Sequence, residues 1–231
     1  MRHIVSAICG LWLATTGAVQ AEPVVVVELY TSQGCSSCPP ADEFLEMLAM
    51  DPHVLPLALH VDYWDYIGWA DVFAQAKFSD RQRAYATAIG SRTIYTPQFI
   101  IAGDDRIEGF DPSEIAKRLR EQLETATAVV LTVTREGDHL VIRAEADPPL
   151  DAPVRVQLVR YEPEETVMIE RGENAGKTIT YRNIVTSWQR LDDWDGVTPL
   201  DVTAPYDGDL PGAVIIQDEG PAQILAAARV D

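Results

Sequence analysis

Apolar runs alternate with amphipathic segments over the first half of this chain. Residues 24–31 are hydrophobic almost throughout, which predicts a central buried strand. Residues 41–50 carry apolar side chains at helical spacing, and their apolar face comprises Ala41, Phe44, Leu45 and Leu48. The acidic side chains of this helix, Asp42 among them, are expected off that face. Residues 54–61 predict a second strand, so the chain opens with a strand, a helix and a strand.

An aromatic segment, residues 63–69, interrupts this alternation. One or two helices are expected after it, and Ser79 and Gln82 have the spacing of a capping box for the second. Arg81 and Arg83 are most simply part of a solvated helix face. We interpret the aromatic segment as the core of an insertion, and the wall of a peptide groove is the alternative.

A hairpin and a helix complete this half of the chain. Residues 97–102 and 106–110 predict two paired strands with a glycine-containing turn between them. Asp111 is expected to cap the helix that follows, because Pro112 and Glu114 suit its first turn.

Short segments of alternating polar and apolar residues dominate the chain after residue 125. The predicted strands are residues 128–134, 140–146, 154–161, 167–170 and 178–188, with further segments at 213–217 and 223–230. Such closely spaced strands are typical of a compact antiparallel sandwich. The fold class is therefore predicted as an α/β domain, residues 22–126, followed by a smaller all-β sandwich-like domain, residues 127–231.

The first residues have the pattern of a secretory signal peptide, predicted as residues 1–21. Arg2 and His3 precede the apolar stretch 4–13, and small residues end at Ala21. The stretch is too short for a stable membrane span, so we expect a periplasmic or secreted protein without stable membrane insertion. An uncleaved anchor and a lipoprotein attached at Cys9 are the weaker alternatives.

Cleavage would leave Cys35 and Cys38 as the only cysteines. They follow a buried strand and a short turn, and they open a helix, whose N-terminus favours a thiolate. A disulfide that closes a loop over two residues adds little stability, because the chain-entropy gain grows with loop length. A redox role is therefore the better interpretation.

The formal net charge of −18 at pH 7 argues against nucleic acid and anionic membrane surfaces as partners. High solubility is an equally good reason for such acidity.

Residues 23–124 resemble the thioredoxin fold, in which a CxxC motif begins the helix after a central strand. Thr96 and Pro97, just before a predicted strand, are a second mark of that family. The resemblance implies a cis proline beside the disulfide and a mixed sheet flanked by helices. It also implies that Thr96 pairs with an extended substrate and that an acid, here Glu28, lies beneath the disulfide and accepts the proton of Cys38. A strand residue on a solvated face is the alternative for Glu28.

The whole chain is similar to an uncharacterised group of exported bacterial thioredoxin-like proteins with a C-terminal β-domain. The resemblance rests on the stretches 28–38 and 171–176. From its position nearest the helix start, Cys35 is expected to be the exposed attacking thiol and Cys38 the buried resolving thiol.

Three functions remain open on these residues. The first is a thiol–disulfide oxidoreductase that acts on protein or peptide thiols and disulfides without a cofactor or metal, in either direction of electron flow. The second is a copper metallochaperone that uses Cys35 and Cys38, with His60 as a third ligand. The third is a binding protein on a redox-inert scaffold.

Overall fold

A computed structural model of the chain describes residues 24–230, so the predicted signal peptide lies outside the described residues. The helices are α1 (Pro39–Leu48), the short 3-10 helix η1 (Asp65–Ile67), α2 (Ala76–Ala88) and α3 (Pro112–Leu123). The strands are β1 (Val25–Thr31), β2 (Val54–His60), β3 (Gln98–Ile101), β4 (Asp105–Glu108), β5 (Val129–Glu136), β6 (His139–Ala146), β7 (Val154–Met168), β8 (Thr178–Trp194), β9 (Leu200–Pro205), β10 (Gly212–Asp218) and β11 (Ile224–Val230). No helix within this described range is long and apolar enough to cross a membrane.

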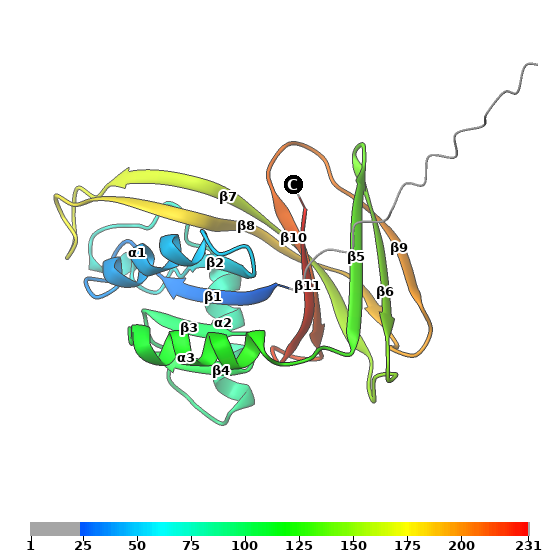
Figure 1. The fold of residues 1–231 in the computed structure, drawn as a ribbon. Coiled ribbons are helices and arrows are strands. Elements are labelled where there is room, and N and C mark those ends of the chain that lie inside the picture. Colours follow the sequence, from blue (N-terminus) through cyan, green and yellow to red (C-terminus); the bar gives the residue numbers. More distant parts are fainter. Residues whose placement is uncertain (1–23, 231) are drawn as a thin grey trace, which may run out of the picture.

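An eight-stranded mixed sheet organises the molecule, in the order β11-β10-β7-β8-β2-β1-β3-β4 (Figure 1). Strand β1 lies inside this sheet, parallel to β2 and antiparallel to β3. Its run of β-branched residues is buried on both faces, as the sequence predicts for a central strand.

The two faces of β1 meet different helices. Val27 and Leu29 pack with residues of α1 and α3, whereas Val26 and Tyr30 belong to the core that includes Phe78 of α2. Side chains alternate across a strand, so neighbouring residues of β1 belong to opposite layers of the fold.

The strands of the second half extend the same sheet. Strand β8 pairs in parallel with β2, through Ala58 and Ile184, and this joins β7, β8, β10 and β11 to the strands of the first half. The other three strands form a small sheet in the order β5-β6-β9, and a shared apolar core packs it against β7, β10 and β11. The sandwich-like packing is therefore present, but one of its layers belongs to the eight-stranded sheet. The predicted domain boundary falls in the link between α3 and β5 and stays a prediction.

The start of helix α2 differs from the prediction, whereas the start of α3 agrees with it. Helix α2 runs unbroken from Ala76, with Gln75 at its N-cap, so the predicted capping box is wrong. Ser79 lies inside the helix and donates a hydrogen bond to Asp62 instead. At α3 the prediction is confirmed, because the Asp111 side chain accepts hydrogen bonds from the N–H groups of Ser113 and Glu114.

Candidate functional site

Residues 32–38, which we call the disulfide loop, connect the end of β1 to the start of α1. Cys35 and Cys38 form a disulfide with an S–S distance of 2.07 Å, and Cys38 is the N-cap residue of α1. Pro39 and Pro40 occupy the first turn, where their missing N–H groups cost little. The dipole of α1 favours negative charge at this end of the helix, so a reduced cysteine would be held closer to its thiolate form.

Both cysteines are buried in this oxidised form. Cys35 is 1% exposed and Cys38 is fully buried, so the predicted exposure of Cys35 is wrong. The preceding Gly34 packs against Trp64: a Cβ atom added to Gly34 would lie 3.2 Å from the Cβ of Trp64. Only Ser36 and Ser37, between the cysteines, are exposed in this part of the loop.

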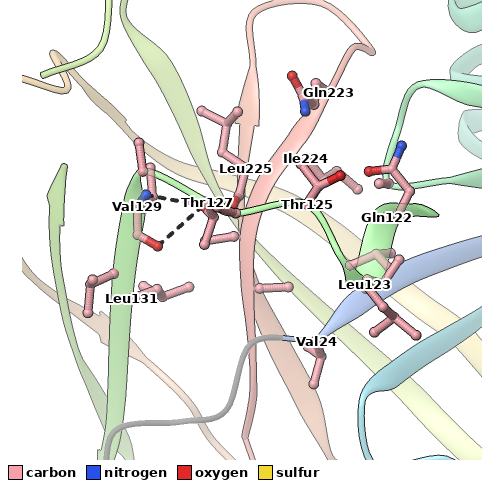
Figure 2. Close-up of a pocket in the computed structure, with 18 of the residues that line it drawn as sticks. Val24, Gln122, Leu123, Thr125, Thr127, Val129, Leu131, Gln223, Ile224 and Leu225 are labelled. Carbon is pink, nitrogen blue, oxygen red and sulfur yellow. Dashed lines mark hydrogen bonds between the residues drawn. The ribbon is translucent and has the colours of Figure 1, made fainter. Parts of the chain in front are cut away.

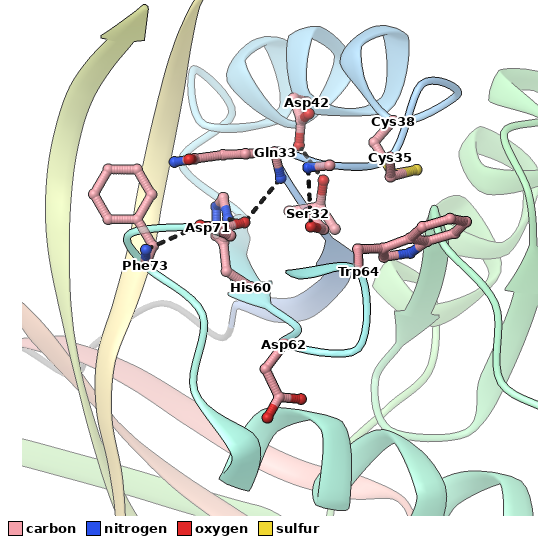
Figure 3. A network of polar contacts seen from close by, with 12 residues as sticks. Ser32, Gln33, Cys35, Cys38, Asp42, His60, Asp62, Trp64, Asp71 and Phe73 are labelled. Atoms are coloured by element: carbon pink, nitrogen blue, oxygen red, sulfur yellow. Dashed lines mark hydrogen bonds and ion pairs between the residues drawn. A yellow bond between two sulfur atoms is a disulfide. The ribbon is translucent and has the colours of Figure 1, made fainter. Parts of the chain in front are cut away.

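Gln33 holds the disulfide loop to the segment that follows β2 (Figure 3). Its backbone N–H donates to the Asp71 carboxylate at 2.8 Å. Its side-chain oxygen accepts a hydrogen bond from the Trp69 indole at 2.8 Å. Asp71 also contacts His60, with 2.7 Å between Oδ2 and Nδ1. The aromatic segment, residues 63–69, thus holds the disulfide loop through a direct hydrogen bond. Neither of the two interpretations of this segment from the sequence included such a contact.

Thr96 and Pro97 are connected to the disulfide loop through Trp64. The Trp64 indole N–H donates to the Thr96 hydroxyl at 2.6 Å, and Trp64 in turn packs on Gly34. The Thr96–Pro97 peptide bond is cis, as the resemblance implies, and Pro97 is buried before β3. Trp64 therefore links Thr96 to the disulfide loop.

Glu28 does not lie beneath the disulfide. Its carboxylate, which is fully buried, accepts two hydrogen bonds from the Arg81 guanidinium at 2.7 and 2.8 Å and one each from the hydroxyls of Tyr30 and Tyr85. Glu28 belongs to the face of β1 that meets α2, whereas α1, which begins at the disulfide, covers the opposite face. The interpretation of Arg81 as a solvated residue is also wrong, since its side chain is 14% exposed.

A different acid, Asp42, is buried one helical turn beyond Cys38. Its backbone N–H donates to the Cys38 carbonyl at 3.1 Å, so the two side chains are neighbours on α1. Burial raises the pKa of Asp42 from 3.8 to about 7. The hydroxyl of Thr31 donates to its Oδ1 at 2.8 Å, whereas its Oδ2 has no hydrogen-bond partner. The prediction that Asp42 lies off the buried face is therefore wrong.

Asp42 is part of a buried polar cluster that also contains His60, Asp71 and Tyr181. The ring of His60 contacts the ring of Tyr181, with centroids 4.9 Å apart. Burial and the nearby carboxylates raise the pKa of Tyr181. Burial opposes ionisation of Asp71, but His60 and two backbone N–H groups outweigh it and lower the pKa of Asp71. His60 is thus a core residue with a carboxylate partner.

The residues of the copper alternative are not assembled into a ligand set. Within residues 24–230, no group of three or more histidine, cysteine and acidic side chains is arranged to hold a metal ion. Cys35, Cys38 and His60 are therefore not assembled as three ligands in this oxidised form, and copper binding by the two reduced thiols stays a prediction.

A cavity of about 570 Å³ opens at the other end of β1, between α3, β5 and β11 (Figure 2). Val24, Leu123, Val129 and Leu225 are among its lining residues, and no described residue of the lining carries a charged or thiol group. The first residues of β1 border this cavity, whereas the disulfide follows the last, so the two sites are separated by the length of the strand.

The sheet, its covering helices and the disulfide at the start of α1 define an α/β protein with a CxxC disulfide. The chain belongs to the family described as protein of unknown function DUF1223, whose family model matches residues 26–217. The prediction of an uncharacterised family is thereby confirmed.

Solved structures similar to this chain include the following two. Protein AGR_C_4864 from Agrobacterium tumefaciens is 33% identical, with 90% of this chain and 95% of that chain covered and a TM-score of 0.77. HBP35 of Porphyromonas gingivalis is 13% identical, with 91% and 75% covered and a TM-score of 0.64, a likeness that shows the fold alone. No curated protein matches the chain.

Proposed function

We propose that this protein is an exported, thioredoxin-like thiol–disulfide oxidoreductase that acts on protein or peptide substrates. The observation that carries the proposal is the Cys35–Cys38 disulfide at the N-terminus of α1, where a thiolate is favoured. The element order β1-α1-β2-α2-β3-β4-α3 supports a thioredoxin-like arrangement of the first half. A disulfide is also the expected state of paired cysteines in an oxidising compartment, which supports export.

In the reducing direction, the Cys35 thiolate attacks one sulfur of a substrate disulfide. The substrate S–S bond breaks, its other sulfur leaves with the bonding electron pair and takes a proton, and a mixed disulfide forms. Cys38 then loses its proton and attacks the sulfur of Cys35, which releases the second substrate thiol and restores Cys35–Cys38. Two electrons pass from the protein to the substrate, and the same steps in reverse oxidise a substrate dithiol.

Asp42 is the group best placed to take the proton of Cys38. It is buried, one turn away on the same helix, and its pKa of about 7 lets it exchange a proton near neutral pH. Glu28 is unsuited to that role, because Arg81 and two tyrosine hydroxyls occupy its carboxylate.

A second candidate is a binding protein on a redox-inert scaffold, and the 1% exposure of Cys35 favours it. For the oxidoreductase, a substrate thiol or disulfide must reach Cys35 by displacing the exposed Ser36–Ser37 segment or the Trp64 side chain. The two candidates therefore differ in whether the disulfide exchanges with an external thiol at all.

The test is exchange between the purified protein and a fluorescent peptide that contains a disulfide. Cys35→Ser is expected to abolish turnover, and Cys38→Ser is expected to accumulate a mixed disulfide with the peptide, because the resolving thiol is absent. Ser113→Ala, at an exposed position on α3, is the control and should keep turnover within about twofold. Unchanged exchange in Cys35→Ser, together with no trapped peptide in Cys38→Ser, would favour the scaffold.

A further inference from the structure

The β7–β8 hairpin carries a side chain from the second half of the chain to the disulfide loop. The two long strands run from the sandwich to the α1 end of the molecule (Figure 1). At the tip, which we define as residues 169–177, Asn174 is 1% exposed. Its side-chain N–H₂ donates to the carbonyl oxygens of Gln33 at 2.9 Å and Cys35 at 2.8 Å. One amide thus satisfies two carbonyls of the loop.

Lys177 completes this contact from the same tip. Its ammonium group donates to the side-chain oxygen of Asn174 at 2.8 Å. The tip is itself well held: Gly176 N–H donates to the Ile169 carbonyl at 2.7 Å, and Ile169 N–H donates to the Lys177 carbonyl at 2.9 Å. The hairpin therefore presents the Asn174 amide in a fixed orientation, with a positive charge on its far side.

The electrostatic consequence concerns the sulfur of Cys35 after reduction. Each carbonyl oxygen of the loop carries a partial negative charge, which opposes a nearby thiolate. The Asn174 N–H₂ group offsets this charge on both oxygens, and the Lys177 ammonium polarises the amide and adds a full positive charge two hydrogen bonds away. Both effects add to that of the α1 N-terminus.

We propose that Asn174 and Lys177 are a positioning pair, supplied by the β7–β8 hairpin, that favours the thiolate form of Cys35 and thereby its reactivity. This inference rests on the proposed oxidoreductase function and gives the hairpin a part in it. Neither residue touches the sulfur atoms, so both act through the backbone of the disulfide loop.

The test is a pH titration of the Cys35 thiolate by its ultraviolet absorbance after complete reduction. Excess dithiothreitol breaks the Cys35–Cys38 bond and is itself oxidised to its cyclic disulfide, so both thiols form whether or not the protein turns over a substrate. The reductant is removed under anaerobic conditions before the titration, because its own thiols absorb and ionise in the same range. Lys177→Met removes the charge at an exposed position and keeps Asn174. Lys117→Met, on the exposed face of α3, is the matched control.

Lys177→Met is expected to raise the midpoint of the thiolate titration by about half a pH unit, the effect of one charge at this separation in a partly solvated site. Asn174→Ser, whose side chain is too short to reach the two carbonyls, is expected to raise it further. Lys117→Met should leave it unchanged.

Equal midpoints of the thiolate titration in Lys177→Met and Lys117→Met overturn the proposal. This holds even if Asn174→Ser has a different midpoint, because the Asn174 amide would then act by packing alone. If the proposed function itself is wrong, the result is different. The unsubstituted protein then exchanges no disulfide with the peptide, while the midpoints of Lys177→Met and Lys117→Met still differ.

Discussion

Replacement of Asp42 by asparagine tests the buried acid beside Cys38. Asparagine has nearly the same shape and can still accept the hydrogen bond from the Thr31 hydroxyl, so the substitution removes mainly the ionisable proton. Asp42 is 4% exposed, and burial raises its pKa from 3.8 to about 7. The native state therefore retains this proton at pH values at which the unfolded chain has already released it.

The linkage between this pKa and stability has a definite sign. Below about pH 4 both states bind the proton, and the contribution of Asp42 to the free energy of unfolding is fully present. As the pH rises from about 4 to about 7, only the native state keeps the proton, and that contribution is lost. A pKa difference of about 3 units corresponds to a loss of about 4 kcal/mol.

The assay is urea unfolding of the oxidised protein at intervals between pH 4 and pH 8. The unsubstituted protein should lose stability relative to Asp42→Asn across this interval, with most of the difference developed by pH 7. Asp80→Asn, whose side chain is 73% exposed, is the control and should follow the unsubstituted protein in parallel. A constant difference between Asp42→Asn and the unsubstituted protein at every pH would contradict a raised pKa of Asp42 in the native state.

The remaining predictions concern two other contacts. Arg81→Met leaves the carboxylate of Glu28 buried without its cation, so it should lower the free energy of unfolding by about 3–5 kcal/mol. The control, Arg83→Met at an exposed position, should lower it by at most about 1 kcal/mol. Equal losses in urea unfolding would contradict this prediction. Gly103 and Gly109 both have positive φ, of 73° and 78°, but only at Gly103 would a Cβ atom meet a backbone oxygen, at 2.1 Å. Gly109→Ala should therefore cost about 1–2 kcal/mol and Gly103→Ala clearly more, and equal melting temperatures for the two variants would show that the clash is relieved.

The disulfide site was predictable because its signals are local. The signals are contiguous: a β-branched run, a short turn, and two cysteines before paired prolines. The run predicts the strand, and the prolines fit the first turn of the helix. The Asp111 cap was predictable for the same reason. The structure confirms the strand, the helix start and the cap.

The predicted role of Glu28 depends on the face of β1 on which its side chain lies. A strand that is buried on both faces has no alternation of polar and apolar residues, so its sequence does not indicate the face. The ion pair with Arg81 joins residues far apart in the sequence, so no local pattern announced it. For Asp42 a signal existed, because it follows Cys38 at the spacing of one helical turn. A carboxyl group is costly to bury, however, so its residue type favours an exposed position.

Asn174 shows the limit of a local analysis most clearly. Residues 171–176 are part of the family resemblance, but the partners of the Asn174 side chain lie 139 and 141 residues away in the sequence. The pairing of β8 with β2 places the β7–β8 hairpin, from the second half of the chain, beside the first half. The sequence predicted strands in this region, but it contained no indication of their place in the eight-stranded sheet.

The most direct test of the central claim is the reduction potential of the Cys35–Cys38 pair, measured by equilibration of the purified protein with glutathione buffers and a count of free thiols. A redox-active pair should show a single, reversible two-electron transition between about −270 mV and about −120 mV, the range of thiol–disulfide oxidoreductases. A value near the upper limit would indicate an oxidant, and one near the lower limit a reductant. A disulfide that stays oxidised in every such buffer would contradict a redox function.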